Sequence, residues 1–204
     1  MEILCLEMTP FVENCYVLRE GGESIVIDPG EATEELKAAV ADTQVTMIVN
    51  THCHIDHAGG NAEMVRLTGA PLLCHADDLP LLRTIEQQGM MFGVPVEASP
   101  DPDRFIAEGD TIHVGSAALR VLHTPGHAPG HVVLVGDGFV IGGDVLFAGS
   151  IGRTDLPGGD YEQLIESIRT KLLPLPDNMV VYSGHGPATT IGRERKHNPF
   201  LTGL

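Results

Sequence analysis

The chain has 204 residues, of which 43% are hydrophobic, and this length and composition are typical of a single soluble globular domain spanning residues 1–204. Its 12 basic and 28 acidic residues give a formal net charge of −16, which disfavours partners with a phosphate backbone such as nucleic acids. The sequence contains neither an apolar run of membrane-spanning length nor a recognisable signal peptide, so no membrane partner is expected.

The four cysteines show no C-x-x-C spacing, and a chain of this size does not need a disulfide framework. We therefore expect free thiols in a reducing cytoplasm, each more suited to buried packing than to reactivity. The cysteines are Cys5, Cys15, Cys53 and Cys74.

The N-terminal third is predicted to begin with three short strands over residues 2–6, 15–19 and 24–28, separated by turns. The third strand ends in Asp28-Pro29-Gly30. A helix over residues 34–40 follows, because apolar residues recur there at helical spacing and Thr33 is a suitable N-cap.

A β-branched, apolar run over residues 45–49 predicts a buried strand, and potential metal ligands follow it directly. If the backbone stays extended, His52 and His54 point to one side and Cys53 to the other, so the two imidazoles can hold one metal. Asp56 and His57 lie beyond the strand, where the chain turns, and they aim from another direction. Because these four ligands point in two different directions, they favour two metal ions over one.

A helix is expected from about Asn61, and a short strand over 71–74. Another helix is expected to start at Asp77 or Asp78 and to run through Ile85. The segment 89–102 contains Met90-Met91-Phe92 and three prolines, and it is interpreted as a loop. An apolar triplet in a loop is either core or part of a lid, and no other segment is a candidate for a lid.

The second half contains a hairpin that makes a specific geometric prediction. The strand from Ala117 leads into a loop that carries His127 and His131. Residues 132–135 and 139–141 read as paired strands around the turn Gly136-Asp137-Gly138. The return strand should therefore bring Asp144 beside His127.

An amphipathic helix capped by Asp160 and a last strand over 179–182 follow, and His185 comes directly after this strand. Candidate ligands thus follow strand ends in four places, at residues 52–57, 127, 144 and 185. Strands and helices alternate in two halves.

Several stretches resemble the metal motifs of the metallo-β-lactamase superfamily in order and spacing: Thr51 to Gly60, His123 to His131, Gly143-Asp144 and Gly184-His185-Gly186. Residues 143–155 and 186–200 narrow the resemblance to the short bacterial branch of the glyoxalase II (hydroxyacylglutathione hydrolase) group. The resemblance implies an α/β fold, an αββα four-layer sandwich with the metal site at one edge of the two sheets.

Carried over onto matching positions, the resemblance implies two divalent metal ions per chain. The first is held by His52, His54 and His127. The second is held by Asp56, His57 and His185, and Asp144 bridges both. Histidine and carboxylate without thiolate favour zinc, and they also accommodate iron or manganese. Asp144 stands where some true β-lactamases have cysteine, which argues against that activity.

The resemblance implies hydrolysis of a small-molecule glutathione thioester of the S-lactoylglutathione type by a metal-bound hydroxide, with Asp56 and Asp144 as the catalytic residues. The main alternative is a mono-iron persulfide dioxygenase on the same fold, with iron on His52, His127 and Asp144. A non-enzymatic module that binds a metal or a partner is the third possibility.

Arg153 matches a substrate-binding residue of the larger glyoxalase II enzymes, and its alternative is an ion-pair or surface arginine. His131 is either a support for the metal ligands or a structural histidine. The chain lacks the C-terminal helical region of the larger enzymes, and the nearest basic substitutes are Arg193, Arg195 and Lys196. The acyl group, the native metal and the oligomeric state stay open.

Overall fold

The computed structural model describes residues 1–203, which form two compact units. The first comprises residues 1–106 and 112–118, and the second comprises residues 107–111 and those from Leu119 onward. Each unit has its own sheet, and each is described by itself. Among the residues described, none of the helices is long and apolar enough to cross a membrane.

The first unit is built on a six-stranded sheet in the order β1-β2-β3-β4-β5-β6. Its strands are β1 (Glu2–Met8), β2 (Glu13–Glu20), β3 (Glu23–Ile27), β4 (Gln44–Val49), β5 (Leu72–Cys74) and β6 (Arg104–Phe105). The first three pair antiparallel, whereas β3, β4, β5 and β6 pair parallel. Because parallel strands end at the same edge of a sheet, the loops after β3, β4 and β5 gather there.

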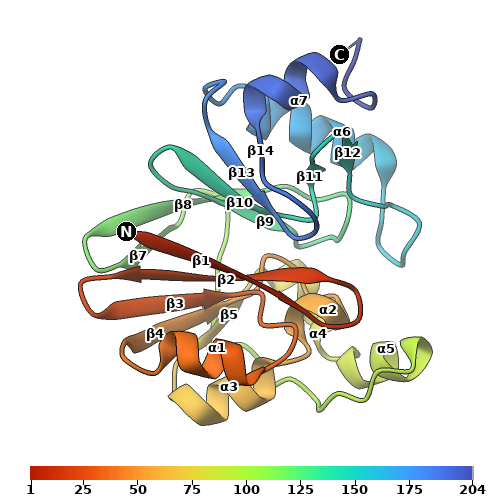
Figure 1. Cartoon of the computed structure of the whole chain (residues 1–204). Coiled ribbons are helices and arrows are strands. Elements are labelled where there is room, and N and C mark those ends of the chain that lie inside the picture. The colour runs from red at the N-terminus through yellow and green to blue at the C-terminus, as the bar shows by residue number, and fades with distance from the viewer. Residues whose placement is uncertain (204) are drawn as a thin grey trace. The chain divides into compact units, whose positions relative to one another are not determined.

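Short helices connect these strands: α1 (Glu34–Val40), α2 (Ile55–Ala58), α3 (Asn61–Thr68), the 3₁₀ turn η1 (Ala76–Asp78), α4 (Leu79–Leu82) and α5 (Ile85–Phe92). Helices α1 and α3 pack on the sheet (Figure 1), where Leu36 and Met64 are fully buried against Val26 and Ile48. Thr33 caps α1 as predicted, since its hydroxyl accepts a hydrogen bond from the Leu36 amide.

The prediction that residues 89–102 form a loop was wrong at its start, because Gly89 to Phe92 belong to α5. The helix ends at Gly93, whose φ of 71° reverses the chain, and the Val94 amide then donates to the Gly89 carbonyl. The three prolines all lie beyond this cap, in the irregular segment that follows. The apolar triplet is therefore presented by a helix.

The second sheet has the order β14-β13-β10-β9-β8-β7. Its strands are β7 (Thr111–Val114), β8 (Ala117–His123), β9 (Val132–Val135), β10 (Phe139–Gly143), β13 (Val180–Ser183) and β14 (Thr189–Thr190). The predicted hairpin is present, since β9 and β10 pair antiparallel with Val140 opposite Val135. Strands β10 and β13 run parallel, so Asp144 and His185 follow strands that end at one edge.

Helices of the second unit cover a second hydrophobic core. They are α6 (Tyr161–Ser167), its π-helical continuation η2 (Ile168–Leu172) and α7 (Ile191–His197), and a small ladder joins β11 (Leu146–Phe147) to β12 (Ser150–Ile151). Leu164, Ile168 and Ile191 pack with Val140 and Val181 of the sheet. Asp160 caps α6 as predicted, accepting from the Gln163 amide at 3.0 Å.

Candidate metal centre

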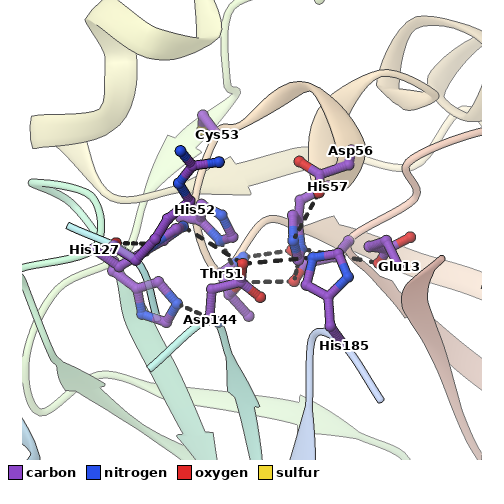
Figure 2. Close-up of polar contacts among 12 residues, drawn as sticks. Glu13, Thr51, His52, Cys53, Asp56, His57, His127, Asp144 and His185 are labelled. Carbon is purple, nitrogen blue, oxygen red and sulfur yellow. Dashed lines mark hydrogen bonds and ion pairs between the residues drawn. The ribbon is translucent and has the colours of Figure 1, made fainter. Parts of the chain in front are cut away.

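Three buried imidazoles gather in the first unit where β4 gives way to α2. The His52 ring centroid lies 4.8 Å from that of His54 and 4.1 Å from that of His57, and the three residues are at most 8% exposed. Figure 2 shows Asp56 and His57 extending from the short helix α2, and Asp56 Oδ2 lies 3.8 Å from His57 Nε2. The four predicted ligands of this unit thus lie together.

Cys53 confirms the predicted alternation, because its side chain points away from the two histidines into the hydrophobic core. Its amide donates to the Asp78 carboxylate at 2.9 Å, which anchors the loop between β4 and α2. A hydrogen bond with the Cys74 thiol and burial both raise the pKa of the Cys53 thiol well above its usual range. A thiol held protonated in the core is a poor metal ligand, so the candidate ligands of this unit are imidazole and carboxylate groups.

Asp28 organises this cluster from the end of β3. One carboxylate oxygen accepts the Thr51 amide at 2.7 Å, and the other accepts the Thr51 hydroxyl at 2.6 Å and lies 3.1 Å from His57 Nδ1. With Nδ1–H donating to a carboxylate, Nε2 becomes the nitrogen of His57 that can bind a metal. Asp28 has a φ of 54°, an uncommon value for a residue other than glycine. This role was missed in the sequence, where only the tripeptide Asp28-Pro29-Gly30 stood out.

Gly30 allows the β3 loop to approach α2 this closely. A Cβ atom built on Gly30 would lie 1.8 Å from the Asp56 carbonyl oxygen, which no side chain can tolerate. The Gly60 amide donates to the Pro29 carbonyl at 2.8 Å, so the residue before this glycine is bound to the start of α3. Backbone packing therefore fixes where Asp56 stands relative to Asp28.

The second unit carries the other three predicted ligands. Asp144 Oδ2 lies 3.5 Å from His127 Nε2 and 3.5 Å from His185 Nε2, so one carboxylate faces two imidazoles (Figure 2). His127 and Asp144 are 2% and 7% exposed, and His185 is half-buried. The proximity of His127 and Asp144, inferred from the hairpin, is confirmed.

Two hydrogen bonds fix these ligands from behind. The Asp144 amide donates to His131 Nε2 at 3.0 Å, and His131 Nδ1 lies 3.1 Å from the Thr124 hydroxyl. Because an N–H donates to Nε2, the fully buried His131 is neutral with its proton on Nδ1. His127 Nδ1 donates to the Arg153 carbonyl at 2.8 Å, which leaves Nε2 as the nitrogen that could bind a metal. His131 thus supports the backbone of a predicted ligand.

The donor chemistry of both clusters fits divalent metal ions. Each described residue in them offers an imidazole nitrogen or a carboxylate oxygen, the combination that zinc, iron and manganese accept. In the first unit, ligand atoms of Asp28, His52 and His57 lie within 4.8 Å of one another. Asp28 already accepts two hydrogen bonds from Thr51, however, so Asp56 is the better carboxylate ligand and Asp28 the support.

Comparison with known proteins identifies the family. The family model of the metallo-β-lactamase superfamily matches residues 8–185. The chain belongs to this superfamily. It is 38% identical to the hydroxyacylglutathione hydrolase GloC of Haemophilus influenzae over 208 residues, which cover 98% of each protein.

Solved structures of the superfamily share the fold. The crystal structure of BLEG-1, a B3 metallo-β-lactamase, matches with a TM-score of 0.91 and 37% identity over 99% of this chain and 100% of that one. TTHA1623 in a di-iron-bound form matches with a TM-score of 0.89 and 38% identity, covering 97% of this chain and 100% of that one. The chain therefore has the mixed α/β metallo-β-lactamase fold with its two sheets, as predicted.

In this superfamily member, the predicted substrate-binding arginine is exposed and already paired. Arg153 Nε lies 2.6 Å from Asp155 Oδ1, and Nη2 lies 2.8 Å from Oδ2, a bidentate ion pair. The hydrogen bond from Arg153 lowers the pKa of Asp155 to about 2. The ion-pair alternative thus describes the structure, and a substrate carboxylate would have to replace Asp155 at the same guanidinium.

The basic residues near the C-terminus differ in their roles. Arg195 donates to the carbonyls of Leu173 and Leu175 and contacts Asp177, so it ties α7 to the preceding turn. Arg193 and Lys196 are exposed. Arg193 and Lys196 thus form a solvated basic surface without Arg195. This weakens the interpretation that the three residues together replace the glutathione site of the larger enzymes.

Proposed function

We propose that this superfamily member is a dinuclear, metal-dependent hydrolase of glutathione thioesters of the S-lactoylglutathione type. The observation that carries the proposal is the 38% identity to a hydroxyacylglutathione hydrolase across 98% of both chains. The buried clusters of imidazole and carboxylate supply the donor chemistry that such a reaction requires.

In this proposal His52, His54 and His127 would hold the first ion. Asp56, His57 and His185 would hold the second, and Asp144 would be a ligand of both. The ions supply Lewis-acid chemistry, which lowers the pKa of a water molecule and polarises the thioester carbonyl. Zinc suits the ligand set, and the di-iron form of TTHA1623 supports iron as the alternative.

The residues of the chain orient and assist this chemistry. Asp56 accepts a hydrogen bond from the attacking water and so directs its lone pair at the carbonyl carbon. Asp28 keeps the proton of His57 on Nδ1 through the 3.1 Å contact, and His131 holds the Asp144 amide at 3.0 Å. Fixed ligands need no reorganisation during the reaction, which favours the transition state.

Arg153 is proposed to bind a carboxylate of the glutathione moiety. Its planar guanidinium already makes two parallel hydrogen bonds to Asp155, and a substrate carboxylate presents the same geometry. Because the pair is exposed, exchanging one carboxylate for another costs little. This contact is remote from the thioester, so it contributes to binding more than to the chemical step.

A second candidate is β-lactam hydrolysis: Asp144 in place of a cysteine argues against it, but the 37% identity to BLEG-1 favours it. One experiment separates the candidates. Purified protein is loaded in turn with zinc and with iron, and hydrolysis of S-lactoylglutathione and of a penicillin is measured. Oxygen uptake with glutathione persulfide is measured with an oxygen electrode. The proposal predicts that thioester hydrolysis has the highest kcat/KM. Faster turnover of the penicillin, or oxygen uptake with one iron per chain, would replace the proposed function.

A further inference from the structure

A pocket of about 420 Å³ opens in the first unit beside Asp56. Its lining comes from the turn between β1 and β2, the loop after β3, the start of α2 and α3, and the segment after α5, namely residues 9–11, 30–32, 55–56, 59–60, 62–63 and 94–97. We call it the hairpin pocket. Asp56, a candidate metal ligand, is one of the lining residues, so the pocket shares this residue with the proposed reaction site.

Backbone packing builds the wall formed by residues 94–97. The Val96 side chain fills the space left by two glycines, since a Cβ atom on Gly89 would lie 2.9 Å from Val96 Cγ2 and one on Gly59 3.2 Å from Cγ1. Asn61 donates to the Ser99 hydroxyl at 3.1 Å, which fastens the end of the segment to α3. The pocket is therefore part of the fold, as binding pockets usually are.

Apolar side chains form part of the lining of the hairpin pocket. Phe11, Ile55, Val94 and Val96 line it, and the Phe11 ring meets Phe92 edge-on with 5.5 Å between centroids. Phe92 is 44% exposed, and the preceding Met90 is 78% exposed, so the apolar surface continues outward along α5. Exposed apolar surface that adjoins a pocket is typical of a ligand-binding site.

The charged groups of the hairpin pocket are all acidic. Glu31, Glu63 and Glu97 line it together with Asp56, and Glu31 is exposed. Glu63 is neutralised by Lys37 at 2.7 Å and Glu97 by Arg66, but both cations lie outside the lining. The exposed Glu31 therefore carries most of the negative charge of the lining, which disfavours the two carboxylates of glutathione there.

We propose that the hairpin pocket binds the acyl half of the thioester and selects uncharged, apolar acyl groups larger than lactoyl. The proposal rests on the proposed thioester hydrolysis and narrows its substrate. A volume of about 420 Å³ equals that of about fourteen water molecules, so a lactoyl group would leave most of it filled with solvent. A longer chain would displace this water and bury its methylenes against Phe11 and Val96.

The test combines binding with kinetics on the metal-loaded protein. Hexanamide, which copies a neutral acyl chain, is titrated while the methyl resonances of Ile55, Val94 and Val96 are followed by NMR. Leu67, exposed on α3 outside the hairpin pocket, serves as the control resonance. Hydrolysis is then measured for acetyl, butanoyl, hexanoyl and succinyl thioesters of glutathione.

The methyl resonances of the pocket should shift with hexanamide and not with succinamate, which copies a charged acyl group. In the hydrolysis assay, kcat/KM should rise up to about fourfold per added methylene. Phe11→Ala should lower kcat/KM for the hexanoyl thioester by about tenfold relative to acetyl, whereas Leu67→Ala should leave the series unchanged. Glu31→Gln should improve the succinyl thioester by about two- to fivefold, and the matched Glu35→Gln on α1 should not.

The two proposals fail in different ways. If kcat/KM is the same for all the acyl thioesters and the methyl resonances do not shift, the acyl site is overturned and thioester hydrolysis stays in place. Methyl shifts without hydrolysis of any thioester would overturn the proposed function, together with the acyl assignment that rests on it. Equal gains from Glu31→Gln and Glu35→Gln would show that net charge, and not the pocket, sets the preference.

Discussion

The close packing around Gly152 gives a sharp test of the second half of the metal centre. Gly152 follows β12 and lies against the loop that carries Asp144. A Cβ atom at this position would lie 1.9 Å from the Asp144 carbonyl oxygen and 3.3 Å from His127 Nδ1. A single added methyl group therefore presses on the backbone of one predicted ligand and the ring of another.

The magnitude of the effect of Gly152→Ala follows from these distances. Real Cβ atoms essentially never approach closer than 3.0 Å, so the contact must open from 1.9 Å by more than an ångström. Such a displacement moves Asp144 relative to His131 and His127. We expect a loss of about 10–100-fold in metal affinity and about 100-fold in kcat/KM for thioester hydrolysis.

Metal affinity is measured by titrating the metal-free protein with zinc against a competing chelator, and stability by thermal unfolding. The matched control is Gly138→Ala in the β9–β10 turn, where φ is 80° and nothing lies within 4 Å of the added Cβ. This control should lose about 1–2 kcal/mol of stability while keeping its metal affinity. Wild-type metal affinity in Gly152→Ala would refute the reasoning.

Three further changes test other parts of the account. Asp144→Ala removes the proposed shared ligand and should reduce kcat by several orders of magnitude. Near-normal turnover would mean that Asp144 is not a ligand. Arg153→Met should raise KM with little change in kcat, by about 1–3 kcal/mol in kcat/KM, and an unchanged KM would exclude it as the carboxylate anchor. Iodoacetamide should label Cys5 before Cys53, because Cys5 is exposed whereas Cys53 is buried, although the pKa of both thiols is raised. Rapid labelling of Cys53 in the native protein, detected by mass spectrometry, would contradict its placement in the core.

Local patterns were enough to predict much of the fold. Alternation along an extended chain placed His52 and His54 on one side and Cys53 on the other, and the structure confirms it. Counting residues from the hairpin turn placed Asp144 beside His127. Both predictions depend on residues close in sequence or joined by one turn, where backbone geometry leaves few alternatives.

The supporting contacts could not be predicted in the same way. Asp28 meets Thr51 and His57 from 23 and 29 positions away, and only the packing of adjacent parallel strands brings them together. Arg153 and Asp155 are close in the sequence, yet an exposed guanidinium can pair with many carboxylates. The sequence alone therefore does not show which carboxylate Arg153 pairs with. At α5, helix propensity up to the Gly93 cap outweighed the prolines that signalled a loop.

The central claim is a dinuclear thioester hydrolase, and it is tested most directly by measuring the rate of S-lactoylglutathione hydrolysis while metal-free protein is titrated with zinc. The account predicts that the rate rises until about two ions are bound per chain and then stays constant. A rate that is maximal at one ion per chain, or protein that binds two ions and hydrolyses no thioester, would contradict it.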